Sequence, residues 1–225
     1  MGPFPDGVYR AQFPYYYRNP EGMPQEAALD YYLNSIKDVF EQCGPADSIA
    51  AIVVEPLQGE GGFIPAPIEW VKAVRKICDE NGILLVADEV QTGFCRTGRM
   101  FATQYWEEAG VQPDILATAK SIAAALKTIE IMERDDLAGC SCEIGEKVSK
   151  RFNEWKEKYP VIGDVRGLGG MIGLEFVKDQ KSKEPYPEFS AAVISGCAKK
   201  GLMIEGAGTY GNVIRFLAPL VMTDE

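Results

Sequence analysis

Two hydrophobic patterns alternate along the first half of the chain. From Pro24 onward apolar side chains recur every three or four residues, which is typical of a helix face that packs on a core. A second stretch of this kind ends near Asn81-Gly82. The unbroken apolar runs at 49–54 and 83–87 predict strands that are covered on both faces, and a shorter strand is expected at 114–117. This order predicts an α/β fold, an open and mostly parallel sheet with flanking helices.

The pattern changes after about residue 121. Residues 125–158 are helical in pattern and rich in charge, and 161–217 hold several short strands around one helix at 188–200. We therefore expect two parts. Residues 1–124 would form part of a large α/β domain, and residues 125–225 would form a helix and a smaller α+β C-terminal unit.

The composition agrees with a soluble globule and excludes several classes of partner. Of 225 residues, 46% are apolar and 25% are charged, which excludes disordered, collagen-like and coiled-coil chains. The net charge of −10 disfavours nucleic acid and anionic membranes, because neutralising phosphates requires clustered Lys and Arg. The start of the sequence, Met1-Gly-Pro-Phe-Pro5, has neither a basic region nor an apolar stretch. We expect no signal peptide, no membrane span and a cytoplasmic location.

The absence of histidine narrows the chemistry. Without His there are no histidine triads, histidine-metal sites or histidine bases, and the six cysteines lack the paired spacing of a disulfide framework or zinc ribbon. We expect no metal site. Gly206-Ala-Gly208-Thr-Tyr-Gly211 matches a dinucleotide-binding fingerprint, but a strand-like segment follows it where a true fingerprint opens a helix. A loop between two strands explains these glycines better.

Acidic side chains follow the predicted strands. Glu55 comes directly after the first strand, and Asp88 and Glu89 come after the second. In open parallel sheets these strand ends line the ligand crevice. For Glu89, a capping role and a functional role are equally open. Asp88 follows five apolar residues and requires a fixed cationic partner, because an unpaired anion there would be costly.

A lysine stands at the next strand end. Lys120 follows Ile115-Leu-Ala-Thr-Ala119 and precedes more small apolar residues. Desolvation lowers the pKa of an amine and makes it nucleophilic towards carbonyl groups. A lysine that forms a Schiff base and an acid that holds a pyridinium nitrogen are the two groups that pyridoxal phosphate chemistry requires. The alternative is a surface lysine whose stem lies along apolar surface.

Two further charges have unusual surroundings. Glu60 lies in the glycine-rich run Gln58-Gly-Glu-Gly-Gly62, where the backbone can approach a ligand closely or simply turn. Arg215 lies inside the apolar run Val213-Ile-Arg-Phe-Leu217. A cation in such a run requires an acidic partner or a carboxylate ligand.

At these residues the sequence resembles the class III, fold-type I, pyridoxal-phosphate-dependent aminotransferases, in particular the 4-aminobutyrate aminotransferase group. The resemblance spans most of the chain. The matching runs are Val54-Glu-Pro-Leu-Gln-Gly-Glu-Gly-Gly62, Ala87-Asp-Glu-Val-Gln-Thr-Gly-Phe-Cys-Arg-Thr-Gly98, Pro113-Asp-Ile-Leu-Ala-Thr-Ala-Lys-Ser-Ile122 and Arg215-Phe-Leu-Ala-Pro-Leu220.

The resemblance implies roles for five residues around the cofactor. Lys120 would be the Schiff-base and proton-transfer lysine, and Asp88 would be the partner of the pyridine nitrogen. Val90 would pack on the ring and Gln91 would hydrogen-bond near its phenolic oxygen. Glu55 would line the cofactor site.

It also implies a substrate-binding pair and a reaction. Arg215 would release Glu60 to bind the α-carboxylate of the second substrate. The reaction would move an amino group from an ω-amino acid of the 4-aminobutyrate kind to 2-oxoglutarate or a similar 2-oxo acid, in a homodimer. The donor stays open among 4-aminobutyrate, ornithine, acetylornithine and 3-amino-2-methylpropanoate.

The sequence departs from the family pattern in two places. The family has an N-terminal part, absent here, whose Ser-Gly loop and helix start hold the cofactor phosphate. After Ala124 the chain also passes directly to Ala125-Leu-Lys-Thr-Ile-Glu130. The family has there a loop and a Gly-Gly-Thr-Tyr segment that reaches the neighbouring subunit's phosphate. Either the chain is a truncated remnant, which would be catalytically inactive and act as a binding or dimerisation module, or it omits stretches of a complete enzyme. A separate alternative function is that of a nicotinamide oxidoreductase based on the glycines at 206–211, which the strand after them disfavours.

Overall fold

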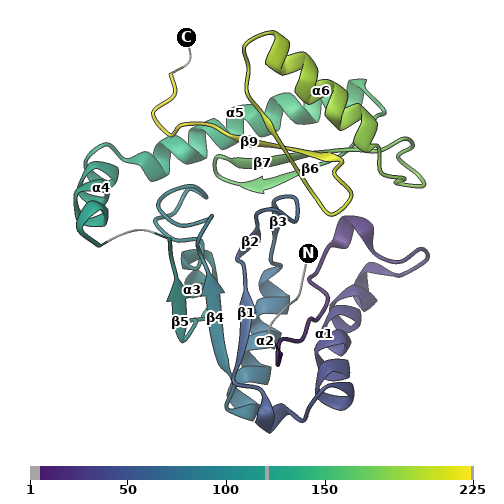
Figure 1. Ribbon diagram of the computed structural model, residues 1–225, viewed down its shortest axis with the longest axis vertical. Helices are drawn as coiled ribbons and strands as arrows, with labels where there is room; N and C mark the ends of the chain where they lie inside the picture. Colours follow the sequence, from purple (N-terminus) through teal and green to yellow (C-terminus); the bar gives the residue numbers. More distant parts are fainter. Residues whose placement is uncertain (1–5, 120–121, 224–225) are drawn as a thin grey trace.

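The computed structural model describes residues 6–119 and 122–223 and is shown in Figure 1. Its first half contains a parallel three-stranded sheet, sheet A, whose strand order is β1-β4-β5. The strands are β1 (Ala51–Val54), β4 (Leu84–Asp88) and β5 (Ile115–Ala117). Helix α2 (Ile68–Asn81) connects β1 to β4, and α3 (Gln104–Glu108) lies between β4 and β5. The predicted α/β architecture is confirmed.

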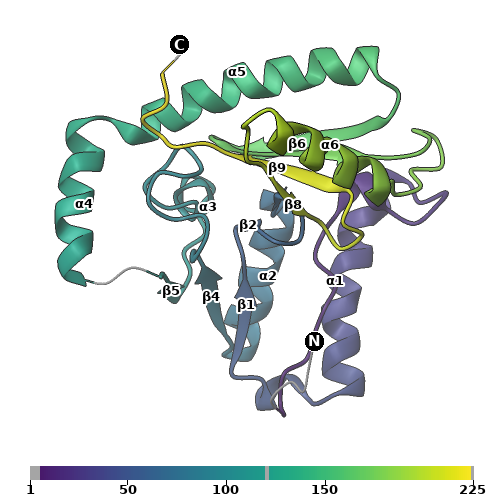
Figure 2. The ribbon, with the colours of Figure 1, turned by 45° about the horizontal axis from the view of Figure 1, so that its top comes forward.

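Two helices cover one face of sheet A. Helix α1 (Gln25–Gln42) packs beside α2, and their apolar faces share one core with the buried residues of β1 and β4 (Figures 1 and 2). The predicted end of α2 is confirmed: Gly82 caps it with a positive φ of 67°, which glycine adopts at little steric cost. A short 3-10 turn, η2 (Ala46–Ser48), leads from α1 into β1.

The opposite face of sheet A is exposed. Val53, Leu84 and Ile115, one on each strand, are 64%, 45% and 47% exposed. The prediction that the first two strands are covered on both faces is therefore wrong for the described residues. The physical reason is that α1 and α2 both pack on the same side, so that residues such as Leu85 and Ala87 are buried while Leu84 is not.

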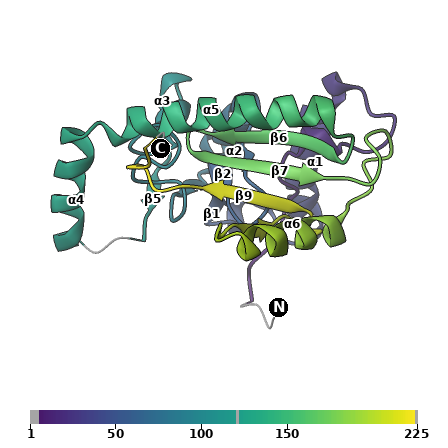
Figure 3. The same ribbon diagram turned by 90° about the horizontal axis from the view of Figure 1, so that it is seen from above.

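The second half forms an antiparallel four-stranded sheet, sheet C, in the order β6-β7-β9-β8. Its strands are β6 (Ile162–Leu168), β7 (Met171–Phe176), β8 (Glu205–Ala207) and β9 (Val213–Leu217). Helices α5 (Leu137–Lys158) and α6 (Pro187–Lys199) share a core with it (Figure 3). On the other face, Met171 packs against a small hairpin formed by β2 (Leu57–Gln58) and β3 (Ile64–Pro65).

The helical region predicted at 125–158 is two helices. Helix α4 (Ile122–Arg134) ends before Asp136, whose φ of 45° breaks the helix and whose side chain accepts a hydrogen bond from the backbone of Gly139. Helix α4 stands at one end of α5 (Figures 1 and 2). The domain boundary at residue 124 remains a prediction. Among the described residues, no helix combines the length and apolarity needed to cross a membrane.

A buried charge cluster ties the N-terminal segment to sheet C. Glu175, on β7, is 1% exposed and accepts hydrogen bonds from Tyr15, Arg18, Arg166 and Asn212. Tyr15 precedes a 3-10 turn, η1 (Tyr16–Arg18), and Arg18 ends it, within a lead-in that is otherwise irregular, as the sequence predicts. One buried carboxylate therefore joins segments that are far apart in the chain.

Candidate functional site

The parallel strands of sheet A bring their polar ends to one edge. Val54 pairs with Ala87, so Glu55 follows β1 at the level where Asp88 ends β4. Asp88 pairs in turn with Ala117 at the end of β5. Lys120 comes three residues later in the sequence and lies outside the described residues.

Asp88 is partly buried at this edge. Its Oδ1 atom accepts a hydrogen bond of 3.0 Å from the backbone N–H of Val90, the one hydrogen bond to its carboxylate within the described part of the chain. The side chain of Val90 is 51% exposed. The cationic partner that the sequence predicts for Asp88 is not among the described residues. The edge thus presents a carboxylate next to an apolar surface.

The adjacent carboxylate has a different role. Glu89 is fully buried, and its two oxygens accept hydrogen bonds from the hydroxyl of Thr92 at 2.5 Å and from the backbone N–H of Thr103 at 2.7 Å. These bonds tie the segment after β4 to the start of α3. Of the two roles left open by the sequence, the structure supports the structural one.

Two other acidic side chains affect the carboxyl group of Glu55. Burial raises the pKa of its carboxyl group, and the negative charges of Asp88 and Glu60 raise it further. A hydrogen bond of 3.2 Å from the backbone N–H of Gly59 works in the opposite direction. The net effect is a pKa for Glu55 above the ordinary value of a glutamate carboxyl group.

Gln91 connects the strand-end edge to the glycine-rich loop between β2 and β3. Its Nε2 atom donates to Oε1 of Glu60 at 3.3 Å, while its Oε1 atom is buried without a hydrogen-bond partner among the described groups. Gly59 makes this contact possible, because a Cβ atom there would lie 2.0 Å from Oε1 of Gln91. An unpartnered buried amide oxygen is costly unless another group meets it.

Arg215, on β9, meets Glu60 from the other half of the molecule. Its Nη1 atom donates to Oε1 of Glu60 at 2.5 Å, and its Nη2 atom donates to Oε2 of Glu205 at 2.7 Å. Burial works to lower the pKa of Arg215, but the two carboxylates outweigh burial and raise it. Arg215 thus has two acidic partners, Glu60 and Glu205, where the sequence predicts that it needs one.

Glu205 is the residue that sequence reasoning missed. It faces Arg215 directly in the antiparallel pair of β8 and β9. The glycines at 206–211 lie at the end of β8 and in the loop 208–212 that joins it to β9, so the fingerprint is part of a β-hairpin and a strand follows it, as the sequence predicts. The sequence offers only part of the signal: a hairpin around this loop brings the acid at 205 near the base at 215, but the register that pairs them comes from the structure.

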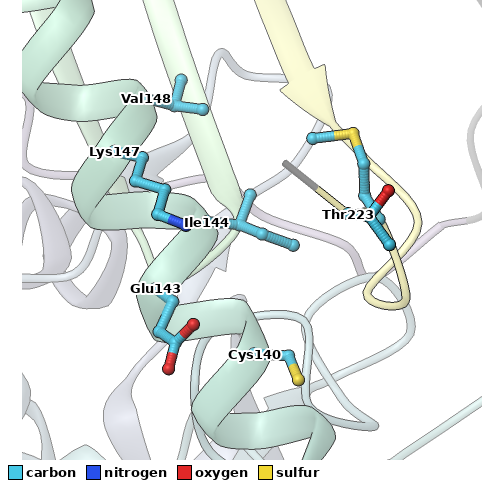
Figure 4. Close-up of a pocket in the computed structure, with 7 residues that line it drawn as sticks. Cys140, Glu143, Ile144, Lys147, Val148 and Thr223 are labelled. Carbon is cyan, nitrogen blue, oxygen red and sulfur yellow. The ribbon is translucent and has the colours of Figure 1, made fainter. Parts of the chain in front are cut away.

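Hollows elsewhere do not involve the predicted site residues. One, of about 230 Å³, lies between α5 and residues 222–223 (Figure 4). A second, of about 400 Å³, lies between the N-terminal segment, the β2–β3 hairpin and the loop before β9. Among the described residues, no group of three or more acidic or thiol side chains is placed to hold a metal ion.

The whole chain matches one protein family. The model described as "Aminotransferase class-III" matches residues 1–126 and again residues 122–225. The two matched stretches overlap at 122–126, beside the position after Ala124 where the sequence is expected to depart from the family pattern.

Named relatives and a solved structure agree with this match. The chain is 38% identical to a protein named "Probable 4-aminobutyrate aminotransferase" from Bacillus subtilis, across 100% of this chain and 59% of that protein. It is 39% identical to "5-aminovalerate aminotransferase DavT" from Pseudomonas putida, across 100% of this chain and 58% of that protein. A crystal structure of an amine transaminase from an uncultivated Pseudomonas species, in a pyridoxal-phosphate-bound form, is 30% identical with a TM-score of 0.82. That comparison covers 95% of this chain and 57% of the other. The chain thus spans under two thirds of the length of these relatives.

Proposed function

The chain belongs to the class III aminotransferases, and on that premise we propose that it is the catalytic part of a pyridoxal-phosphate-dependent transaminase. The observation that carries the proposal is the edge of sheet A, which gathers Glu55, Asp88 and the Glu60–Arg215 pair. We propose an ω-amino acid as donor, as in the names of the two relatives, and a 2-oxo acid such as 2-oxoglutarate as acceptor.

The described residues fit the ring of pyridoxal phosphate. Asp88 offers a carboxylate that one backbone N–H engages, and Val90 offers a half-exposed apolar residue beside it. Gln91 has a buried amide oxygen that meets no hydrogen-bond donor among the residues described. These are an anion for a ring nitrogen, a surface for a flat ring and a free hydrogen-bonding group. When bound, pyridoxal phosphate supplies a ring that accepts the negative charge developing at the substrate carbon.

The chain's own residues would perform the remaining tasks. Asp88 would keep a proton on the ring nitrogen, because a nearby carboxylate favours the charged form of a pyridine. Val90 and Gln91 would fix the orientation of the ring. Lys120 would hold the cofactor and move a proton to and from the substrate carbon as general acid and base.

Arg215 would bind the carboxylate of the acceptor. Its planar guanidinium suits a carboxylate in a bidentate contact, which is strong and directional. Glu60 would occupy Arg215 while a donor without an α-carboxylate is bound, and would leave it when the acceptor enters. One pocket could then accept two substrates of different charge pattern in turn.

We also infer that the protein forms a homodimer. Light scattering of the purified chain would test this inference by measuring its mass in solution.

Covalent trapping tests the proposed function. The purified chain is mixed with pyridoxal phosphate, reduced with borohydride and digested for peptide mapping by mass spectrometry. We expect a yellow species that the reductant bleaches and a pyridoxyl adduct on Lys120. The matched variants are Lys120→Arg, which should lose the adduct, and Lys127→Arg, which should keep it, since Lys127 pairs with Glu130 on α4.

Two outcomes would contradict the proposal. An adduct on Lys127 or Lys72 would overturn the assignment of Lys120. Absence of cofactor uptake would favour the alternative of an inactive remnant that serves as a binding or dimerisation module. Addition of 4-aminobutyrate or 5-aminovalerate to the loaded protein then tests the donor, because a true donor discharges the yellow colour.

A further inference from the structure

Arg215 is held by two carboxylates, and only one of them belongs to the switching pair. Glu60 engages Nη1 and Glu205 engages Nη2, so each terminal nitrogen of the guanidinium has one acidic partner. The side chain of Arg215 is only 14% exposed, whereas those of Glu60 and Glu205 are 74% and 72% exposed. The buried Nε atom of Arg215 has no hydrogen-bond partner among the described residues.

The two acids approach Arg215 from different bodies of the fold. Glu60 lies on the loop between β2 and β3, in the first half of the chain. Glu205 lies on β8, directly opposite Arg215 on the neighbouring strand β9. Residues that face each other across an antiparallel pair stay neighbours when the sheet moves as a unit. A movement of the loop can therefore remove Glu60 without removing Glu205.

This difference changes what an incoming carboxylate meets. With Glu60 gone, Arg215 and Glu205 still form a pair without net charge, and Glu205 still engages Nη2. An incoming carboxylate can use the N–H groups that Glu205 leaves free, but it meets a guanidinium whose charge Glu205 already neutralises and whose Nη2 atom Glu205 shares.

We propose that Glu205 is a specificity-determining residue that acts through Arg215 and weakens the binding of substrates carrying an α-carboxylate. The inference rests on the proposed function, in which Arg215 receives that carboxylate. Glu205 would bias the site towards ω-amino acids, which lack a carboxylate beside the reacting carbon. Glu205 competes with the α-carboxylate of a substrate for the guanidinium of Arg215. It therefore gives selectivity by weakening one class of substrate, not by adding contacts to the other.

The test measures carboxylate binding at Arg215 without the cofactor. Pyruvate and, separately, 2-oxoglutarate are titrated into the ¹⁵N-labelled chain, and the Nε–H signal of Arg215 is followed by NMR. Loss of that signal in Arg215→Lys assigns it. The variants are Glu205→Gln, Glu60→Gln, the double variant, and Glu184→Gln as a matched control, because Glu184 is an exposed acid of the same half that pairs with Lys178.

We expect Glu205→Gln to lower the concentration of pyruvate or 2-oxoglutarate at the titration midpoint about two- to five-fold. This factor corresponds to the free energy that an exposed ion pair contributes. The double variant should bind more tightly than Glu60→Gln by a similar factor, and Glu205→Asp, whose shorter side chain keeps the charge, should fall between wild type and Glu205→Gln. Thermal unfolding midpoints should not move, which a merely structural role for Glu205 would not allow.

Three outcomes would overturn the inference. One is a Glu205→Gln midpoint equal to that of wild type, another is an equal shift in Glu184→Gln, and the third is no response of Arg215 to either acid in the double variant. Because no step of the titration uses pyridoxal phosphate, failure of the proposed function appears separately, as an absence of cofactor uptake or of the Lys120 adduct.

Discussion

Asp88 and Glu89 are adjacent in sequence, yet their surroundings assign them to different tasks. Asp88 is partly exposed and accepts one backbone hydrogen bond, whereas Glu89 is fully buried with both oxygens engaged. We predict that Asp88→Asn binds pyridoxal phosphate weakly while the half-reaction with the amino donor slows by orders of magnitude. The amide keeps the shape but removes the charge that holds the ring nitrogen protonated. Absorbance-monitored single-turnover kinetics measure this effect, and an unimpaired rate would refute the role.

Glu89→Ala is the contrasting variant. It leaves the buried N–H of Thr103 without an acceptor, and an unsatisfied buried donor costs about 1–3 kcal/mol. We predict that the free energy of unfolding falls by this amount for Glu89→Ala and hardly changes for Asp88→Asn, as measured by urea denaturation. Equal losses in both variants would show that the two carboxylates do not differ in the way the structure indicates.

At the scale of single residues, the sequence predicts which side chains require a partner but not always which partner they find. Arg215 in an apolar strand indicates an acidic partner, and the family resemblance points to Glu60. The contact with Glu205 could not be predicted in this way, since it depends on the register of β8 against β9. A shift of one residue would turn Glu205 to the other face of the sheet.

Helices and strands are the features that the sequence predicts best. The spacing of apolar residues identifies α1, α2, β1, β4 and β5 to within a few residues, because each buries one regular face or run. The same pattern merges α4 and α5 into one helix, since a helix-breaking residue conformation such as that of Asp136 leaves the hydrophobic period almost unchanged. Apolar runs also do not show which face of a strand is covered, so the exposure of Leu84 was not predictable from them.

Two glycines in helices test how α5 meets sheet C. A Cβ atom at Gly145, in α5, would lie 2.0 Å from the backbone oxygen of Gly169 in the turn between β6 and β7. We predict that Gly145→Ala lowers the free energy of unfolding by about 1–3 kcal/mol or more, because the helix and the turn must separate.

Gly196, in α6, has no atom within 4 Å of a Cβ atom built at its position. Gly196→Ala should therefore raise the free energy of unfolding by up to about 1 kcal/mol, because alanine favours the helix more than glycine does. Thermal or urea unfolding distinguishes the two, and a stabilised Gly145→Ala would contradict the packing described.

At the scale of the whole molecule, Glu175 couples the N-terminal segment to sheet C in a pH-dependent way. Burial works to raise the pKa of Glu175, but Arg166, the hydroxyl of Tyr15 and Arg18 outweigh it and hold the pKa below its usual value. A carboxyl group whose pKa is lower in the folded state stabilises the fold above the unfolded pKa. That stabilisation is lost as the pH falls through the folded value.

We predict that the free energy of unfolding of the wild-type chain falls as the pH is lowered from 7 to below about 4, and that Glu175→Gln removes part of this dependence. At pH 7 the variant should lose about 3–5 kcal/mol, since Arg18 and Arg166 keep buried charges without their partner. Urea denaturation at several pH values measures both effects. Glu184→Gln, at the exposed pair with Lys178, serves as control and should follow the wild-type profile. An unchanged pH profile in Glu175→Gln would contradict the coupling.

The exposed face of sheet A bears on how the purified chain behaves in concentrated solution. Val53, Leu84 and Ile115 form a water-facing apolar strip, and β5 is the last strand of its sheet among those described. Apolar strips beside an unpaired strand promote self-association and loss of solubility. We predict that the chain binds the dye 8-anilinonaphthalene-1-sulfonate in its folded state, and that Leu84→Lys lowers dye fluorescence and raises the concentration at which light scattering first detects aggregates. The concentration at which aggregates first appear would then measure how far the uncovered face of sheet A limits the colloidal stability of the chain.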